Sequence, residues 1–135
     1  MDRKLILVLV KVLGTRCLYA YPSCSYCRKK VRANDQHNGS LWCSSCNISY
    51  DEEMVDYRYH VNLNVFDGQS FANVTIFGEC WNAFFGLNAT EFCRYVTKCE
   101  TKASIKGVDM NQAVHSAMER CLVGEMVKLA FQQYS

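Results

Sequence analysis

The sequence has little proline, no long apolar run and little net charge, and each absence excludes a class of protein. One proline in 135 residues, half of which are hydrophobic, argues against a disordered or low-complexity chain. No apolar stretch reaches the roughly 20 residues that a membrane-spanning helix needs, so we expect no membrane partner. A formal net charge of +2 is too small to indicate nucleic acid by itself. What remains is a globular chain with the length of one domain.

Motifs for enzyme chemistry are also absent. The sequence contains no phosphate-binding loop, no paired carboxylates and no convincing Ser-His-Asp or Cys-His arrangement. His37 and His60 stand alone, and His115 is expected on the polar side of a helix, so all three are more typical of solvated or hydrogen-bonded histidines than of ligands. We therefore expect a binding protein without a small-molecule substrate, and not an enzyme.

An antiparallel hairpin is the strongest secondary-structure prediction. Residues 57–66, YRYHVNLNVF, alternate so that the tyrosines and aliphatic side chains share one face, while Arg58 and His60 share the other. Asp67-Gly68 is a turn dipeptide, and residues 70–77 supply the second strand. We expect the apolar face, with both of its tyrosines, in the core.

Four further elements follow from composition and spacing. The β-branched, leucine-rich run 5–13 predicts a buried strand, and residues 125–134 predict a final strand. Residues 78–86 predict a short helix closed by Gly86. Residues 110–123 have the spacing of a longer helix. The expected apolar stripe of this helix consists of Met110, Ala113, Val114, Ala117, Met118 and Cys121.

Four of the nine cysteines form two matched pairs. Cys24 and Cys27 are separated by two residues, as are Cys43 and Cys46, and fifteen residues lie between the pairs. Each pair can turn two thiolates toward one point about 2.3 Å from a metal ion, and two pairs complete a tetrahedral zinc site. Because four thiolates leave no position for water, we expect one structural zinc ion. The other cysteines show no ligand spacing and are expected to be core or half-exposed thiols; they are Cys17, Cys80, Cys93, Cys99 and Cys121.

A secreted, disulfide-rich glycoprotein is an open alternative. The chain starts with basic residues and an apolar run, and removal of its first twenty residues would leave an even number of cysteines. Four glycosylation sequons fit this alternative, at Asn38, Asn47, Asn73 and Asn88. Against it, Lys11 interrupts the apolar run early, and the matched pairs account for four cysteines without disulfides.

The order of strand, cysteine insert, hairpin, helical connection and strand resembles the C-terminal OB-fold family of the replication protein A large subunit. The matching stretches are CLYAYPSCSYC at 17–27, LWCSSC at 41–46 and YRYHVNLNV at 57–65. In that family a zinc ribbon interrupts the barrel between its first two strands. The resemblance implies a mostly β, single OB-fold domain over residues 1–135, with the ribbon insert at about 21–50.

A closer resemblance is to the N-terminal domain of the DNA damage-induced apoptosis suppressor family, or noxins. YPSC at 21–24, YRY at 57–59, TIFGECWNAFFGLNAT at 75–90 and CLVGE at 121–125 carry it. It implies a role in cell survival after DNA damage, in nucleus and cytoplasm, and makes the N-terminal apolar run the first barrel strand. An OB-fold has five strands, and only four can be placed before Ser135. Either the chain is a truncated form or something else completes the barrel.

The resemblance also implies single-stranded DNA, or DNA-replication and repair proteins, as partners. OB-folds of this class bind single strands with a basic groove and with aromatic rings on which bases stack. A knuckle held by zinc would project the basic cluster that follows it from a rigid turn. The candidate nucleic-acid contacts are Tyr26, Arg28, Lys29, Lys30, Arg32, Trp42, Arg58, His60 and Phe71, the last near Arg58 and His60 across the hairpin.

A protein-interaction OB-fold that does not bind nucleic acid is a further open alternative. The low net charge and the acidic run at 51–53 favour it.

Overall fold

The computed structural model describes residues 3–33 and 40–134, so His37 and Asn38 lie outside the described residues. These residues form two compact units that alternate along the chain. Unit 1 consists of Met1–Cys17, Asn62–Thr75 and Asn111–Ser135, and unit 2 of Leu18–Val61 and Ile76–Met110. Strands β6 (Asp56–Phe66) and β7 (Phe71–Phe77) contribute to both units. A single domain over residues 1–135 stays a prediction.

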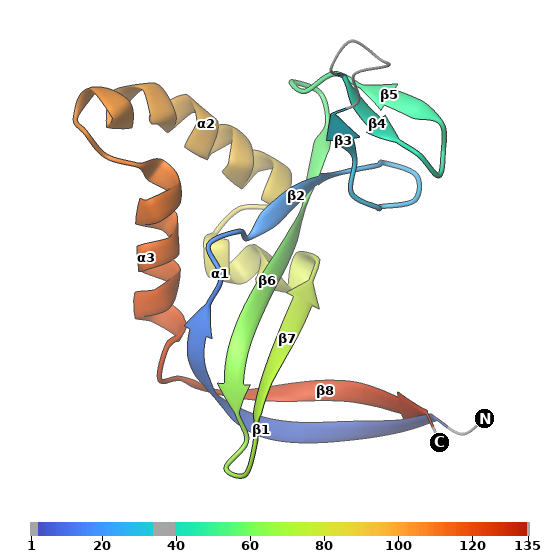
Figure 1. The fold of residues 1–135 in the computed structure, drawn as a ribbon, viewed down its shortest axis with the longest axis vertical. Helices are drawn as coiled ribbons and strands as arrows, with labels where there is room; N and C mark the ends of the chain where they lie inside the picture. The colour runs from blue at the N-terminus through green and yellow to red at the C-terminus, as the bar shows by residue number, and fades with distance from the viewer. Residues whose placement is uncertain (1–2, 34–39, 135) are drawn as a thin grey trace. The chain divides into compact units, whose positions relative to one another are not determined.

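Unit 1 is built on the long strand β1 (Arg3–Thr15), which contains the predicted strand 5–13 (Figure 1). Antiparallel pairs from Arg3↔Tyr134 to Lys11↔Met126 join β1 to β8 (Met126–Tyr134). The last residues of β1 pair with the end of β6, and the register shifts between Val12 and Gly14. The final strand predicted from the sequence is therefore confirmed, and it lies beside the first strand.

The prediction that all of residues 5–13 are buried is wrong. Val10 and Val12 are 3% and 0% exposed, but Leu5 and Leu7 are 70% and 60% exposed. Side chains alternate between the two faces of a strand, and among the described residues no layer covers the face that carries the leucines. The continuous apolar run predicted a strand buried on both faces, whereas the structure buries only one face of β1.

The predicted helix 110–123 is confirmed as α3 (Met110–Leu122), but its buried stripe is rotated from the predicted one. Met118 and Leu122 are the buried residues, whereas Ala113, Ala117 and Cys121 are exposed.

His115 of α3 is not on a solvated face, because it is held against the end of β1. The Nε2 atom of His115 lies 2.9 Å from the carbonyl oxygen of Thr15 and 3.0 Å from Oε1 of Glu119. The same Glu119 oxygen accepts a hydrogen bond of 3.3 Å from the backbone N–H of Thr15. The face of α3 that packs against β1 thus includes polar side chains bonded to the backbone. The spacing of apolar residues could not predict these polar contacts.

Unit 2 begins with β2 (Ala20–Ser23), a strand that the sequence analysis did not place. It pairs antiparallel with the start of β6, from Ala20↔Tyr59 to Ser23↔Asp56. A three-stranded antiparallel ribbon follows, made of β3 (Arg32–Ala33), β4 (Leu41–Cys43) and β5 (Ile48–Tyr50) (Figure 1). The insert predicted at about 21–50 therefore contains a β-ribbon together with the two cysteine pairs.

The helical connection is larger than predicted. A 3-10 turn η2 (Glu79–Trp81) leads into α1 (Asn82–Phe85), which ends as predicted at Gly86, in the left-handed region with φ 82°. No helix was predicted where α2 (Ala89–Ile105) lies, and this helix buries Ala89, Val96 and Ala103. Its signal was a capping box, because the Asn88 side chain accepts from the backbone N–H of Glu91 at 2.8 Å. Among the described residues no helix is both long and apolar enough to cross a membrane.

The predicted alternation of β6 is confirmed, and Tyr59 is the centre of an aromatic core in unit 2. Tyr59 is 1% exposed and its ring stacks on Phe85, with centroids 4.4 Å apart. Its hydroxyl donates a 2.7 Å hydrogen bond to the carbonyl of Leu87. Burial raises the pKa of Tyr59, so the neutral phenol is the form that the fold favours. Tyr57 is half-buried and packs against the ribbon.

Cys93 on α2 is expected to be much less reactive than the exposed thiols. Burial raises the pKa of Cys93 to about 12, so at pH 8 it holds roughly a thousandfold less thiolate than an ordinary thiol. Greater intrinsic nucleophilicity offsets part of this, and we expect alkylation to be about 30-fold slower. Timed iodoacetamide labelling with peptide mass spectrometry measures it, with exposed Cys17 and Cys121 as internal references. Equal rates at pH 8 would contradict the prediction, as would a Cys93 rate that fails to rise toward pH 10.

Candidate functional site

The two cysteine pairs form two knuckles with the same backbone geometry. In the first, the N–H of Arg28 donates to the carbonyl of Cys24 at 2.9 Å, and in the second the N–H of Asn47 donates to that of Cys43 at 2.8 Å. Arg28 and Asn47, each directly after the second cysteine of its pair, have φ of 63° and 59°. This left-handed conformation is uncommon outside glycine. Its occurrence at both matched positions indicates that the two cysteine pairs form the same kind of turn.

The four thiols of the knuckles meet at one point. All four Sγ atoms lie within 4.8 Å of one another, and those of Cys27 and Cys43 are 3.5 Å apart. A tetrahedral ion with metal–sulfur bonds of about 2.3 Å requires sulfur–sulfur distances of about 3.8 Å, so the cluster fits a metal ion. Cys24 and Cys43 are buried, and their cluster includes Val31 and Val55. The sequence prediction that these four cysteines lie together is confirmed.

Tyr50 prepares Cys24 to act as a thiolate. Its hydroxyl lies 3.0 Å from the Cys24 sulfur and accepts a hydrogen bond of 3.0 Å from the backbone N–H of Ser25. Burial by itself raises the pKa of Cys24, but hydrogen bonds from Tyr50 and from nearby backbone N–H groups outweigh it and lower the pKa to about 6. For Cys46, the neighbouring Cys27 thiol and burial raise the pKa to about 12. A divalent cation at the centre would favour the thiolate at all four positions.

The predicted basic cluster projects from the first knuckle and from β3. Arg28, Lys29, Lys30 and Arg32 are all exposed, and Tyr26 within the knuckle is 78% exposed. Lys29 donates to the hydroxyl of Ser45 at 3.1 Å.

A groove of about 340 Å³ runs beside the ribbon, lined by Lys30, Arg32, Ala33, Trp42 and Ser44. Arg32 and Trp42 are cross-strand neighbours on β3 and β4. Two of the predicted cations therefore line the same groove as the predicted aromatic ring.

Arg58 and His60 belong to an aromatic cluster that the sequence analysis identified only in part. The Arg58 guanidinium lies 5.1 Å from the centroid of the Phe77 ring, and its Nη1 donates to the hydroxyl of Tyr21 at 3.2 Å. His60 stacks on Phe77 at 6.2 Å and meets the edge of Tyr21 at 5.2 Å. Burial, with a contribution from Lys30, lowers the pKa of His60, so the ring is neutral at pH 7.

Two buried donors or acceptors in this cluster have no partner among the described residues. They are Nε of Arg58 and Nδ1 of His60. Buried polar atoms are nearly always hydrogen-bonded, so these two atoms are exceptions to a general rule. Tyr21 and Phe77 were missed, although residue counting across the hairpin could have found Phe77.

The expected place of Phe71 is wrong. Phe71 packs on Phe66, with ring centroids 4.6 Å apart, next to the turn of the hairpin. Because Phe66 and Phe71 flank the turn, the residue opposite His60 is Phe77, six positions further along the chain. Phe71 is 74% exposed.

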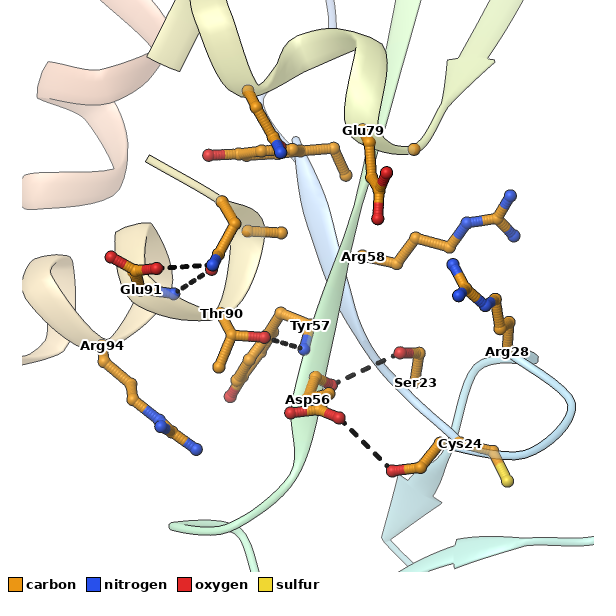
Figure 2. Close-up of a pocket in the computed structure, with 16 residues that line it drawn as sticks. Ser23, Cys24, Arg28, Asp56, Tyr57, Arg58, Glu79, Thr90, Glu91 and Arg94 are labelled. Carbon is orange, nitrogen blue, oxygen red and sulfur yellow. Dashed lines mark hydrogen bonds between the residues drawn. The ribbon is translucent and has the colours of Figure 1, made fainter. Parts of the chain in front are cut away.

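A cavity of about 490 Å³ lies in unit 2, between the first knuckle, the start of β6 and the N-terminal part of α2 (Figure 2). Polar and charged side chains line it, including Arg28, Arg58 and Glu79. The side chain of Arg58 passes close to Gly78. A Cβ atom added to Gly78 would lie 4.0 Å from Nη2 of Arg58.

This chain is similar to several known proteins. The family described as the replication factor-A C terminal domain matches residues 7–126. The DNA damage-induced apoptosis suppressor protein of Mus musculus is 30% identical over 110 residues, and that of Homo sapiens is 28% identical over 127 residues. These matches cover 79% and 93% of this chain, which spans only 12% of the length of each relative. A 70 kDa DNA-binding subunit of replication protein A from Arabidopsis thaliana is 34% identical over 88 residues, 65% of this chain and 10% of that protein.

A solved structure of a replication protein A heterotrimer bound to ssDNA is similar in fold. The TM-score is 0.62 at 20% identity, and the match covers 99% of this chain and 29% of that one. Together with the ribbon insert and the helices before β8, this likeness confirms the OB-fold class predicted from the sequence.

Proposed function

Because the chain belongs to the replication factor-A C-terminal domain family, we propose that it is a zinc-stabilised OB-fold module that binds single-stranded DNA. The family match supports the fold and the class of partner. The proposal concerns binding and not catalysis.

Zinc is the ion that the cysteine cluster favours. Soft thiolate ligands in a closed tetrahedral arrangement are typical of structural zinc sites. Cys24, Cys27, Cys43 and Cys46 would hold the ion, and its chemistry there is to bind thiolates and so to add folding free energy. No position is left for a reacting water molecule.

The observation that carries the proposal is the groove that Lys30, Arg32 and Trp42 line together. Single-strand binders combine cations that follow the phosphates with rings on which bases stack, and each stacked base is worth about 1–3 kcal/mol. The Arg58, Phe77, His60 and Tyr21 cluster offers the same combination a second time. Of the candidate contacts, Phe71 receives the least support, because its ring packs on Phe66.

The biological role is proposed from the relatives. Two of them are named DNA damage-induced apoptosis suppressor proteins, and we propose that this module serves cell survival after DNA damage, in nucleus and cytoplasm. Since the chain spans 12% of their length, the module would supply the contact with DNA or with a replication or repair protein.

Titration of a fluorescent oligothymidine at two salt concentrations tests strand binding. In the Lys30→Glu plus Arg32→Glu variant we expect much weaker binding. Because two phosphate contacts are lost, the salt dependence of log K should fall by about 1.4. Trp42→Leu should weaken binding by about 1–3 kcal/mol at both salt concentrations.

The matched control is Lys98→Glu plus Lys102→Glu, which makes the same charge change on exposed positions of α2. It should bind nearly as the wild type does. Absence of binding by the wild type, or equal losses in both charge-reversed variants, would remove the claim.

A protein-docking module is the second candidate, and exposed leucines favour it. Leu5, Leu7 and Leu9 are 70%, 60% and 54% exposed on one face of β1. Exposed apolar patches of this kind mark interaction sites. Binding of a replication or repair protein through this face would survive Lys30→Glu plus Arg32→Glu, whereas strand binding would not.

A further inference from the structure

Six charged side chains line the cavity beside the first knuckle, and within residues 3–33 and 40–134 none of them forms an ion pair. The side chain of Arg58 bonds only to the neutral Tyr21 hydroxyl, and those of Arg28 and Glu79 have no hydrogen-bond partner within the same residues. The other three charged side chains bond to polar groups. Asp56 accepts from the Ser25 hydroxyl at 3.4 Å, and Glu91 accepts from Asn88 at 2.5 Å. Arg94 donates to the carbonyl of Glu53 at 3.4 Å.

The two arginines are held in place by one tyrosine. The Tyr21 hydroxyl donates to the carbonyl of Arg28 at 3.3 Å and accepts from Nη1 of Arg58 at 3.2 Å. Arg28 is fixed further by its left-handed backbone at the end of the knuckle, with φ 63°. Figure 2 shows the side chains of Arg28 and Arg58 on the same side of the cavity, with Arg94 on the other.

This arrangement suits a phosphate group. Two guanidinium groups without a carboxylate between them attract an anion, and arginine binds phosphate in a bidentate manner. Arg58 also has a buried Nε atom without a partner among the described residues, so the hydrogen-bonding capacity of its guanidinium is not fully used.

Glu79 adds the means to recognise a base. An ionised carboxylate can only accept hydrogen bonds. It therefore favours a base edge that carries an amino group and disfavours one that carries a carbonyl group at the same place. The volume of about 490 Å³ falls within the range of small-ligand sites.

We infer that this cavity holds one nucleotide of a bound single strand, with its phosphate between Arg28 and Arg58 and the amino edge of its base against Glu79. The inference rests on the proposed function and adds base preference to it. Cytosine would be preferred over uracil, which has the same shape but a carbonyl oxygen in place of the amino group. The backbone N–H of Glu91, in the first turn of α2, does not bind the phosphate, because it already donates to the side chain of Asn88.

Equilibrium titrations of the whole chain with oligodeoxycytidine and oligodeoxyuridine of equal length test this. In the wild type we expect about tenfold tighter binding of the cytidine oligomer, the effect of one charge-assisted hydrogen bond. In Glu79→Gln the two affinities should come within about twofold, because an amide can donate as well as accept. Glu125→Gln makes the same charge change at an exposed site outside the cavity and should keep the preference.

Arg28→Gln separates the phosphate contact from the base contact. It should weaken binding of both oligomers, lower the salt slope by about 0.7, and leave the cytidine preference in place. If both oligomers bind but Glu79→Gln keeps the wild-type ratio, the nucleotide cavity is refuted while strand binding stands. If neither oligomer binds the wild type, both proposals fail.

Discussion

Replacing Cys43 with serine is expected to abolish stoichiometric zinc binding and to unfold the β3–β5 ribbon. Zinc in small structural sites contributes about 10–16 kcal/mol of apparent binding free energy at neutral pH, most of which is folding free energy. Cys43 is 1% exposed and belongs to the buried cluster of the ribbon, so its loss removes both a ligand and part of a small core. Elemental analysis of protein never exposed to chelators, with amide NMR spectra of the ribbon, measures the effect.

Cys17→Ser is the matched control, because Cys17 is exposed and lies outside the thiol cluster. It should retain one zinc ion per chain and an unchanged spectrum. Full zinc content in Cys43→Ser would contradict the proposed ligand set. A wild type that contains no zinc, with disulfides in place of thiols, would instead support the secreted alternative.

Tyr59→Ala is expected to lower the free energy of unfolding by about 3–5 kcal/mol. The substitution removes a ring that is 1% exposed and stacks on Phe85, and it leaves the Leu87 carbonyl without its 2.7 Å hydrogen bond. A loss of this size is a large part of the stability of a typical domain. Urea unfolding at constant zinc concentration, followed by circular dichroism, measures it.

Two further variants divide this loss into its causes. Tyr59→Phe keeps the ring and removes only the hydroxyl, so about 1 kcal/mol should be lost. Tyr95→Ala removes the same kind of side chain from an exposed position, 58% accessible on α2, and should change stability by less than about 0.5 kcal/mol. Equal effects of Tyr59→Ala and Tyr95→Ala would show that the stacked cluster is not the core of unit 2.

Local patterns explain what could be predicted. The two cysteines of each pair are three positions apart, so a single short turn brings their sulfurs together. The structure places all four sulfurs in one cluster. The alternation in β6 likewise depends on the strand alone, and its burial follows the predicted faces. By contrast, α2 was missed because its few buried residues, seven positions apart, leave a weak periodic signal.

The candidate binding residues divide in the same way. Lys30, Arg32 and Trp42 were predicted as contacts because they lie within a few residues of the cysteines, and the structure places them along one groove. Tyr21 was missed because it meets Arg58 only when β2, a strand that was not predicted, lies beside β6. Phe77 was missed because the hairpin pairs were not counted from the turn.

The sequence by itself determined the thiol cluster, the hairpin, the last strand and, through its resemblance, the family. Each of these depends on residues close together in the chain, where backbone geometry leaves few alternatives. Only the tertiary structure decided that Tyr21 meets Arg58, which face of β1 is exposed, and that Arg28 and Glu79 line one cavity. These juxtapositions depend on strand register and on the packing of distant segments, and a shift of one residue in either would place different side chains together.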